Sequence, residues 1–199
     1  MATAVIYDLE FTAWEGSMRH SWLRPGEFRE VVQIGAVRVD AATLEQRARF
    51  DVLVRPRINV CLSPYLERLT GITTDDVRAR GIDFATAFED FLAFADGDVC
   101  SAFGRDELVF GENLRLYGFT PSRPQPEYRD SRPWFRANGV ETIGLHSCDI
   151  GPRLGVPFEG QTHNALADSL SVAAGMRALV AKGARSLFAD LVPAAKTAA

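Results

Sequence analysis

Two carboxylates lie two positions apart in an apolar segment near the start of the chain. The segment YDLEFTAWE, residues 7–15, carries Asp8 and Glu10 among residues suited to the interior of a sheet. Alternate side chains of a strand project from one face, so these carboxylates would lie close enough to share a ligand. Because like charges at that distance repel, the pair predicts either a bound cation or the point at which the strand leaves the core for solvent.

Two further acidic residues occupy the beginnings of expected helices. Asp106 follows the apolar residues 98–103, at a position where an acid can also serve simply as a helix cap. His163 and Asp168 are five apart and cannot share one helix face, since each residue turns an α-helix by about 100°. They converge if Asn164 caps the helix, which leaves His163 on the incoming loop and Asp168 in the first turns. Taken alone, Asp106 is better explained as a helix cap or first-turn acid, and His163 and Asp168 as solvated surface groups.

The composition favours a globular protein. The chain has 199 residues, 47% of them hydrophobic and 24% charged, with no apolar run long enough to span a bilayer. A formal net charge of −4 argues against nucleic-acid binding by overall charge, but a local basic groove is compatible with it. The three cysteines are scattered without a CxxC pair, and the first residues lack the basic and apolar regions of a secretory leader. We therefore expect free thiols, no membrane segment and a cytoplasmic location.

Hydrophobic periodicity predicts strands first and then alternating strands and helices. The early strands span residues 3–12, 29–39 and 46–54, the last two joined by a short polar turn as in an antiparallel meander. Apolar residues then recur three and four apart, which predicts helices capped by Ser63 and by Thr73 or Thr74, and a further helix over 83–95. A short strand over 98–103 completes this half, and the order predicts a mixed α/β layer fold.

The second half contains one irregular region between helices. A helix is expected over 105–118, ending at Gly118. Residues 119–134 contain four prolines and are expected to form a surface loop. A short helix stopped by Gly151 and Pro152 follows, and residues 163–184 form the most regular helix, rich in Ala and Leu. We expect one domain over residues 1–190 and a tail over 191–199.

Taken in chain order, these segments resemble the DEDDh family of 3′-to-5′ exonucleases, also called the DnaQ-like group. DLE, AFGRDELVF and HNALAD are similar to its three exonuclease blocks. DLEFTAWE, RPRINVCLS and LTGITTDDV resemble most closely the Eri-like branch, which includes exonucleases acting on histone-mRNA 3′ ends and on small RNAs, and bacterial relatives labelled KinA pathway inhibitors. The resemblance implies an RNase H-like fold, a central mixed sheet of about five strands flanked by helices.

The resemblance also implies a catalytic set. Asp8, Glu10, Asp106 and Asp168 would bind two divalent cations, Mg²⁺ or Mn²⁺, because hard carboxylate oxygens suit both ions. Two such ions about 3.5–4 Å apart can stabilise the attacking and the leaving oxygen of an in-line phosphoryl displacement. His163 would be the general base for the attacking water, since the pKa of imidazole lies close to working pH.

A second group of residues is expected to bind the substrate. Phe11, Thr12, Trp14, Leu69 and Gly71 are candidates for holding the 3′ end, by stacking and by close backbone approach. Core packing is the alternative for Phe11 and Leu69, because most residues of these types are buried. Three arginines beside the proline-rich segment are candidates for phosphate contacts, with a solvated face as the alternative: Arg129, Arg132 and Arg136.

The leading hypothesis is an exonuclease that hydrolyses single-stranded RNA or short 3′ overhangs to nucleoside 5′-monophosphates. The same chemistry on DNA is an alternative, because recognition of the 2′-hydroxyl depends on a few contacts that a sequence does not display. A non-catalytic module that uses the fold for nucleic-acid binding or regulation is another. The acids and His163 weigh against such a module, which has no need of all five groups. The resemblance also allows a homodimer.

Overall fold

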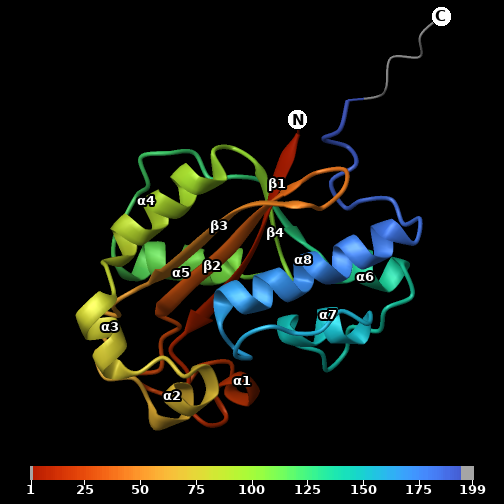
Figure 1. Ribbon diagram of the computed structural model, residues 1–199. Coiled ribbons are helices and arrows are strands. Elements are labelled where there is room, and N and C mark those ends of the chain that lie inside the picture. The colour runs from red at the N-terminus through yellow and green to blue at the C-terminus, as the bar shows by residue number, and fades with distance from the viewer. Residues whose placement is uncertain (1, 194–199) are drawn as a thin grey trace, which may run out of the picture.

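The fold is built on one five-stranded sheet with the order β3-β2-β1-β4-β5, seen in the computed structural model of Figure 1, which describes residues 2–193. β1 pairs antiparallel with β2 and β2 with β3, whereas β4 is parallel to β1 and β5 to β4. The strands are β1 (Thr3–Phe11), β2 (Val31–Asp40), β3 (Gln46–Leu53), β4 (Val99–Ala102) and β5 (Tyr128–Asp130). The predicted meander and the mixed sheet of five strands are confirmed.

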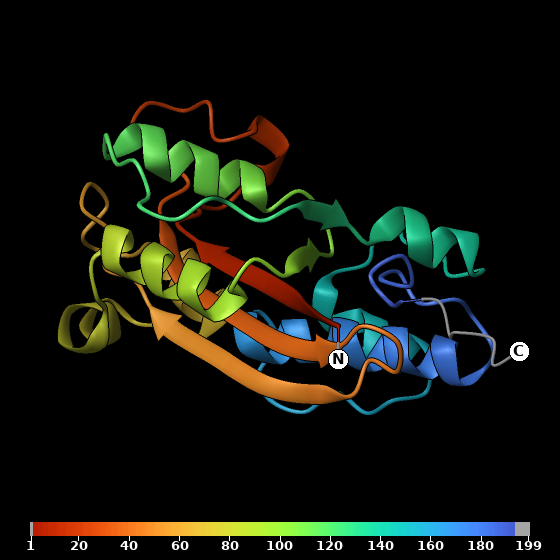
Figure 2. The same cartoon turned by 90° about the horizontal axis from the view of Figure 1, so that it is seen from above.

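Helices cover both faces of this sheet. α4 and α5 pack on one face, and α7 and α8 lie against the other, as the view from above shows (Figure 2). The helices are α1 (Ser17–His20), α2 (Pro64–Thr70), α3 (Thr74–Arg80), α4 (Phe84–Ala95), α5 (Glu107–Leu116), α6 (Arg132–Ala137), α7 (Ile150–Arg153) and α8 (Ala165–Ala181), with a 3₁₀ turn η1 (Ser147–Asp149) before α7. In the described range, none of them combines the length and apolar character needed to cross a bilayer.

The alternation of side chains along β1 places its two acids on the face that α8 covers. Val5, Tyr7 and Leu9 belong to the core beneath α4 and α5, and Ala4 and Ile6 belong to the core beneath α8. Asp8 and Glu10 continue the series of Ala4 and Ile6, because successive side chains of a strand alternate between faces. The first half of the strand is therefore core on both faces, and the second half brings carboxylates to the α8 side.

Local capping explains where α2 and α3 begin. The Ser63 side chain accepts from Leu66 N, and the Thr73 side chain accepts from Asp76 N within a capping box. These two caps confirm the predicted starts near Ser63 and Thr73. Gly71, with φ 72, closes α2, so the chain turns sharply between the two short helices.

Two expectations about the second half are wrong in part. Residues 119–134 are not entirely loop, because β5 adds a fifth strand at the edge of the sheet and α6 begins at Arg132. Gly151 and Pro152 lie inside α7 instead of stopping it. The N–H groups in the first turn of a helix have no helical partner, so a proline there, which lacks an N–H group, removes no hydrogen bond. The chain leaves α7 through Gly155, whose φ is 82. The predicted tail over 191–199 falls mostly outside the described residues.

Candidate active site

A cleft of about 430 Å³ runs from the end of β1 to the start of α8. All five predicted catalytic residues line it, although they come from distant parts of the chain: from β1, from the residue before α5, and from the start of α8 with the loop before it. The acidic part of its wall consists of Asp8, Glu10, Asp106 and Asp168, with His163 beside them.

Asp8 and Glu10 are both buried, each with 8% of its surface exposed. Burial, followed by the negative charges of Asp106 and Asp168, raises the pKa of Asp8 well above its usual range. Burial and then Asp8 itself raise the pKa of Glu10 in the same direction. The site therefore disfavours negative charge unless a positive charge is supplied.

Asp106 directly precedes α5 but does not act as a capping side chain there. Its backbone is helical, and its carboxylate makes no capping hydrogen bond within the described structure. The carboxylate instead lines the cleft, where burial and then Glu107 raise its pKa to about 7. The alternative of a simple helix cap therefore does not account for this acid.

The start of α8 has the geometry that makes His163 and Asp168 converge. Asn164 caps the helix by accepting a hydrogen bond of 3.2 Å from Ala167 N, and His163 precedes the cap in a left-handed conformation with φ 58. Asp168 is only 3% exposed, and burial raises its pKa to about 7. Gln33 of β2 anchors this helix start, since its Oε1 accepts from Ala165 N at 3.0 Å.

The donor set fits a hard divalent cation. One ligand atom each of Glu10, His163 and Asp168 lies within 4.8 Å of the others. Oδ1 of Asp168 is buried and has no hydrogen-bond partner among the described residues, so this oxygen is free to bind a cation. Carboxylate oxygens in this number and environment are the ligands that Mg²⁺ and Mn²⁺ prefer.

Two residues that the sequence did not single out complete the polar wall, namely His146 and Ser147. Oγ of Ser147 donates a hydrogen bond of 2.7 Å to Oδ1 of Asp8. The ring of His146 meets that of His163 edge to face, with centroids 5.3 Å apart. Burial, followed by this neighbour, lowers the pKa of His163. Both residues come from a segment expected to be an ordinary short helix, and no local pattern marked them.

Apolar side chains also line the cleft. Phe11, Trp14 and Leu69 line it as predicted, joined by Trp22 and Tyr65, which were not predicted. Trp22 packs against Phe11 at 5.5 Å between ring centroids, and its Nε1 donates to Thr12 O at 2.9 Å.

Thr12 and Gly71 do not line this cleft. Thr12 is buried, and its hydroxyl accepts from Glu30 N at 2.9 Å and donates to Phe28 O, so it fixes the chain beyond β1. A methyl group on Gly71 would lie 2.3 Å from Nε2 of Gln161, so this glycine packs against the segment that leads to α8.

The three arginines predicted to contact phosphate are occupied elsewhere. Arg129 forms a bidentate pair with Asp190, and Arg132 pairs with Asp130. Arg136 donates to Thr142 at 2.9 Å. None of the three lines the cleft.

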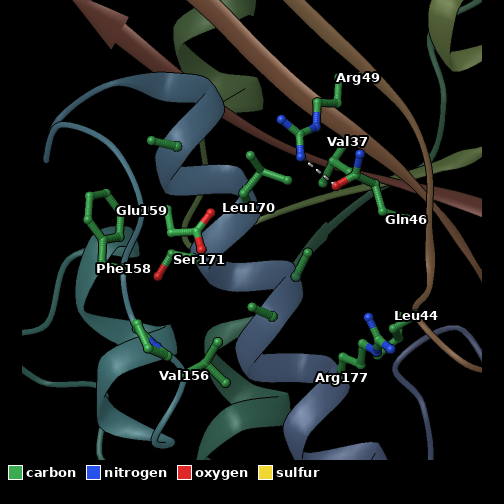
Figure 3. Close-up of a pocket in the computed structure, with 14 residues that line it drawn as sticks. Val37, Leu44, Gln46, Arg49, Val156, Phe158, Glu159, Leu170, Ser171 and Arg177 are labelled. Carbon is green, nitrogen blue, oxygen red and sulfur yellow. Dashed lines mark hydrogen bonds between the residues drawn. The ribbon is translucent and has the colours of Figure 1, made fainter.

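Another hollow, of about 250 Å³, lies on the far side of α8 between that helix, the β2–β3 hairpin and residues 156–159 (Figure 3). Its wall is mostly apolar, with Arg49 and Arg177 at the rim and Glu159 as its carboxylate. It contains none of the five predicted catalytic residues, all of which line the first cleft.

Comparisons with known proteins agree with this geometry. A family model described as exonuclease, of the RNase T type, matches residues 5–175. No curated protein sequence matches the chain.

Solved structures share the fold. The nuclease domain of 3′hExo, a DEDDh family member bound to rAMP, is 23% identical with a TM-score of 0.76, over 92% of this chain and 94% of that one. Cell-death related nuclease 4 is 18% identical with a TM-score of 0.74, over 94% and 66%. E. coli exonuclease I in complex with a dA16 oligonucleotide is 15% identical with a TM-score of 0.69, over 92% and 42%.

The family match covers every residue that lines the acidic cleft, from β1 to the start of α8. The order of the acidic residues and the mixed sheet agree with it. The chain therefore belongs to the exonuclease family that the RNase T type model describes, and it has the fold of the solved DEDDh nuclease structure.

Proposed function

We propose that this protein is a two-metal exoribonuclease that removes nucleoside 5′-monophosphates from single-stranded RNA or short 3′ overhangs. The observation that carries the proposal is one cleft lined both by four carboxylates with His163 and by aromatic side chains. We also propose that residues 1–190 act as one exonuclease domain, which the family match over residues 5–175 supports.

Four carboxylates would hold the cations: Asp8, Glu10, Asp106 and Asp168. Their burial and raised pKa values support this role, since bound positive charge would relieve the repulsion among them. When bound, divalent cations supply charge stabilisation for the phosphoryl displacement. Mg²⁺ and Mn²⁺ both suit the oxygen donors.

His163 would accept the proton of the attacking water. Its lowered pKa keeps the imidazole neutral near pH 7, the form that can act as a base. Its place on the loop before Asn164 lets the ring face the cleft while the helix behind it stays fixed. The ring of His146 supports that of His163 from one side.

The aromatic wall would hold the terminal nucleobase. Phe11, Trp14 and Leu69 lie in the same cleft as the acids, and every base offers a face for stacking. Such binding does not depend on sequence, which suits an enzyme that advances one nucleotide at a time.

RNA is the proposed substrate on the basis of similarity. The segments that resemble the Eri-like branch support it, as do the two RNA-related neighbours, 3′hExo with rAMP and the 3′-exonuclease that recognises the histone mRNA stem-loop. The exonuclease I structures contain single-stranded DNA, so DNA is the competing substrate.

The test is a time course on a 5′-labelled single-stranded RNA and on its DNA counterpart, with Mn²⁺, with Mg²⁺ and with EDTA. Asp8→Asn is run beside the parent, and Asp75→Asn, which changes an exposed aspartate of α3, is the matched control. We expect a metal-dependent ladder that shortens from the 3′ end, is lost in Asp8→Asn and persists in Asp75→Asn.

The ratio of the RNA and DNA rates decides between the two substrates. Equal degradation by the parent and by folded Asp8→Asn would contradict the assignment of the site. Binding of RNA without cleavage would instead favour a regulatory module.

A further inference from the structure

Trp22 has an uncommon backbone conformation where it lines the cleft. Its φ is 54 and that of Ser21 before it is 51, so two successive residues other than glycine lie in the left-handed region. A bulky residue rarely adopts this conformation, and one that does is held there by its surroundings. Trp22 lines the cleft together with Phe11, so the contacts that hold Trp22 also shape the aromatic part of the cleft wall.

Hydrogen bonds and one cation hold Trp22 in place. Its Nε1 donates to Thr12 O at 2.9 Å, and its backbone N donates to Ser17 O at 3.0 Å. Cζ of Arg29 lies 5.4 Å from the centroid of the Trp22 ring and 6.0 Å from that of Phe11. A guanidinium at such distances is attracted by the face of an aromatic ring, most strongly by that of tryptophan. One cation therefore contacts both aromatic side chains.

Arg29 contacts these rings from outside the cleft. The cleft is lined by Trp22 and Phe11 but not by Arg29. Arg29 lines a separate hollow of about 470 Å³, to which Trp22 and Glu112 also contribute. A strand bound in the cleft would touch the rings and not the guanidinium. Any influence of Arg29 on the binding of that strand therefore acts through the two rings.

α5 fixes both the side chain and the backbone of Arg29. The carboxylate of Glu112 accepts from Nε of Arg29 at 2.8 Å and also from Nη2, and such a bidentate pair fixes the plane of the guanidinium. Nδ2 of the buried Asn113 donates to Arg29 O at 2.7 Å, and its Oδ1 accepts from Val31 N at 3.0 Å. The same helix begins directly after Asp106. One helix thus positions a carboxylate of the cleft and, through Arg29, its aromatic side chains.

We propose that Arg29, held by Glu112, is a positioning residue for the binding of the terminal nucleobase. Its guanidinium keeps Trp22 and Phe11 in the arrangement in which they meet the base. The inference rests on the proposed function, because it requires a nucleic-acid 3′ end in the cleft. Aromatic faces stack on any base, so Arg29 affects how tightly the terminal nucleotide is bound and not which nucleotide is accepted.

The test compares two RNA oligonucleotides that differ only at the 3′ end, where one carries an ordinary nucleotide and the other an abasic one. Arg29→Met removes the charge and keeps an unbranched apolar side chain. We expect its KM for the ordinary RNA to be roughly fivefold higher than that of the parent, with kcat unchanged. KM for the abasic RNA, which has no terminal base to stack, should equal that of the parent. Arg29→Lys keeps the charge but loses the planar fork, so its KM for the ordinary RNA should lie between the two.

Arg38→Met is the matched control. Arg38 of β2 pairs with Asp98 at 3.5 Å, and its Cζ lies 5.3 Å from the centroid of the Phe94 ring. Its side chain is 24% exposed, compared with 27% for Arg29. Neither Arg38 nor Phe94 lines the cleft, so this variant loses the same kinds of contact and should keep the parental KM for both RNAs.

Two outcomes of these kinetics would overturn the proposal. One is an unchanged KM of Arg29→Met for the ordinary RNA. The other is an equal rise in KM for the two RNAs, or an equal rise in Arg38→Met, because a general loosening of the fold would then account for the effect.

A second measurement needs no substrate. The chain has three tryptophans, so replacing Trp14 and Trp134 by Phe leaves Trp22 as the only fluorophore of this type. In this background, Arg29→Met should make the quenching of Trp22 fluorescence by acrylamide stronger, because the ring loses the guanidinium on its face. Arg38→Met should leave the quenching unchanged. Equal quenching with and without Arg29→Met would show that Arg29 does not hold Trp22.

The two measurements distinguish failure of this inference from failure of the proposed function. Hydrolysis of RNA by the parent, with the same KM in Arg29→Met, would reject Arg29 as a positioning residue and retain the enzyme. Absence of RNA hydrolysis by the parent would reject the enzyme. The quenching of Trp22 would then still decide whether Arg29 fixes the ring.

Discussion

Ser147 and Asp8 are 139 residues apart in the chain, yet Oγ of Ser147 donates a 2.7 Å hydrogen bond to Oδ1 of Asp8. The segment that carries Ser147 is itself fixed to α8. Ser171 Oγ donates to Cys148 O at 3.0 Å and accepts from Gly151 N at 3.0 Å. The orientation of one carboxylate on β1 therefore depends on a 3₁₀ turn attached to the helix that carries Asp168.

Ser147→Ala should weaken metal binding by about 10- to 100-fold, which is the usual effect of removing the partner of a metal ligand. The measurement is the dependence of the exonuclease rate on Mn²⁺ concentration, together with the rise in melting temperature on adding Mn²⁺. Ser122→Ala, at an exposed serine bonded to Glu89, is the control and should leave both unchanged. An unaltered Mn²⁺ dependence in Ser147→Ala would show that the hydrogen bond does not position Asp8.

The raised pKa values of Asp106 and Asp168, both about 7, predict how stability depends on pH without metal. The folded protein keeps protons that the unfolded chain releases between pH of about 4 and about 7, so this contribution is full below pH 4 and is lost as pH rises to 7. Asp106→Asn removes one such group. In EDTA, its melting temperature relative to the parent should therefore rise from pH 4 to pH 7. A difference that stays constant over this interval would contradict the assignment.

The convergence of much of the proposed catalytic set could be predicted because its positions follow local rules. Alternation along β1 puts Asp8 and Glu10 on one face, and the capping chemistry of Asn164 puts His163 before α8 and Asp168 within it. Asp106 follows a strand whose burial was evident from its apolar residues. Each of these inferences needs no more than a few neighbouring residues. The order of the segments along the chain then gave the resemblance to the exonuclease family, which implied that the residues form one site.

The unpredicted features depend on contacts between distant segments. Ser147 lies in a three-residue 3₁₀ turn without periodicity, so nothing local marks its approach to Asp8. β5 has only three residues and forms because β4 offers it a free edge. Arg129 is a reasonable candidate for phosphate binding until its pairing with Asp190, 61 residues later, is taken into account. The structures of these segments are determined by tertiary contacts and cannot be read from local residue propensities.

The lowered pKa of His163 predicts the acid limb of the pH–rate profile. The base must be neutral, so kcat at saturating metal should fall as pH drops below 6.5, the ordinary value for histidine. His146→Phe keeps an aromatic neighbour but removes the electrostatic influence by which His146 lowers the pKa of His163. The limb should then move to higher pH, and this shift is measured from kcat between pH of about 5 and about 8. An unmoved limb would show that His146 does not influence the base.

Gly35→Ala should move the start of α8, with His163 and Asp168, away from the carboxylates of β1. Gly35 faces Asp8 across the β1–β2 ladder, and a methyl group there would lie 2.0 Å from Leu166 N and 2.2 Å from the carbonyl carbon of Ala165. The start of α8 would have to move away from the sheet and carry His163 and Asp168 with it. We expect a loss of about 1–3 kcal/mol in the free energy of unfolding. We also expect a fall of about 100-fold in kcat, since a displacement near 1 Å can cost that much.

Gly111→Ala is the control for Gly35→Ala, because Gly111 lies within α5 and a methyl group there meets only the end of the Arg115 side chain at 3.6 Å. It should stabilise the protein by up to about 1 kcal/mol, through the higher helix propensity of alanine, and leave kcat unchanged. Thermal melts and rates on one RNA substrate measure both variants. Full activity in Gly35→Ala would mean that the close approach of α8 to β2 is not what aligns His163 and Asp168 with the carboxylates of β1, because the helix could then shift without consequence for the reaction.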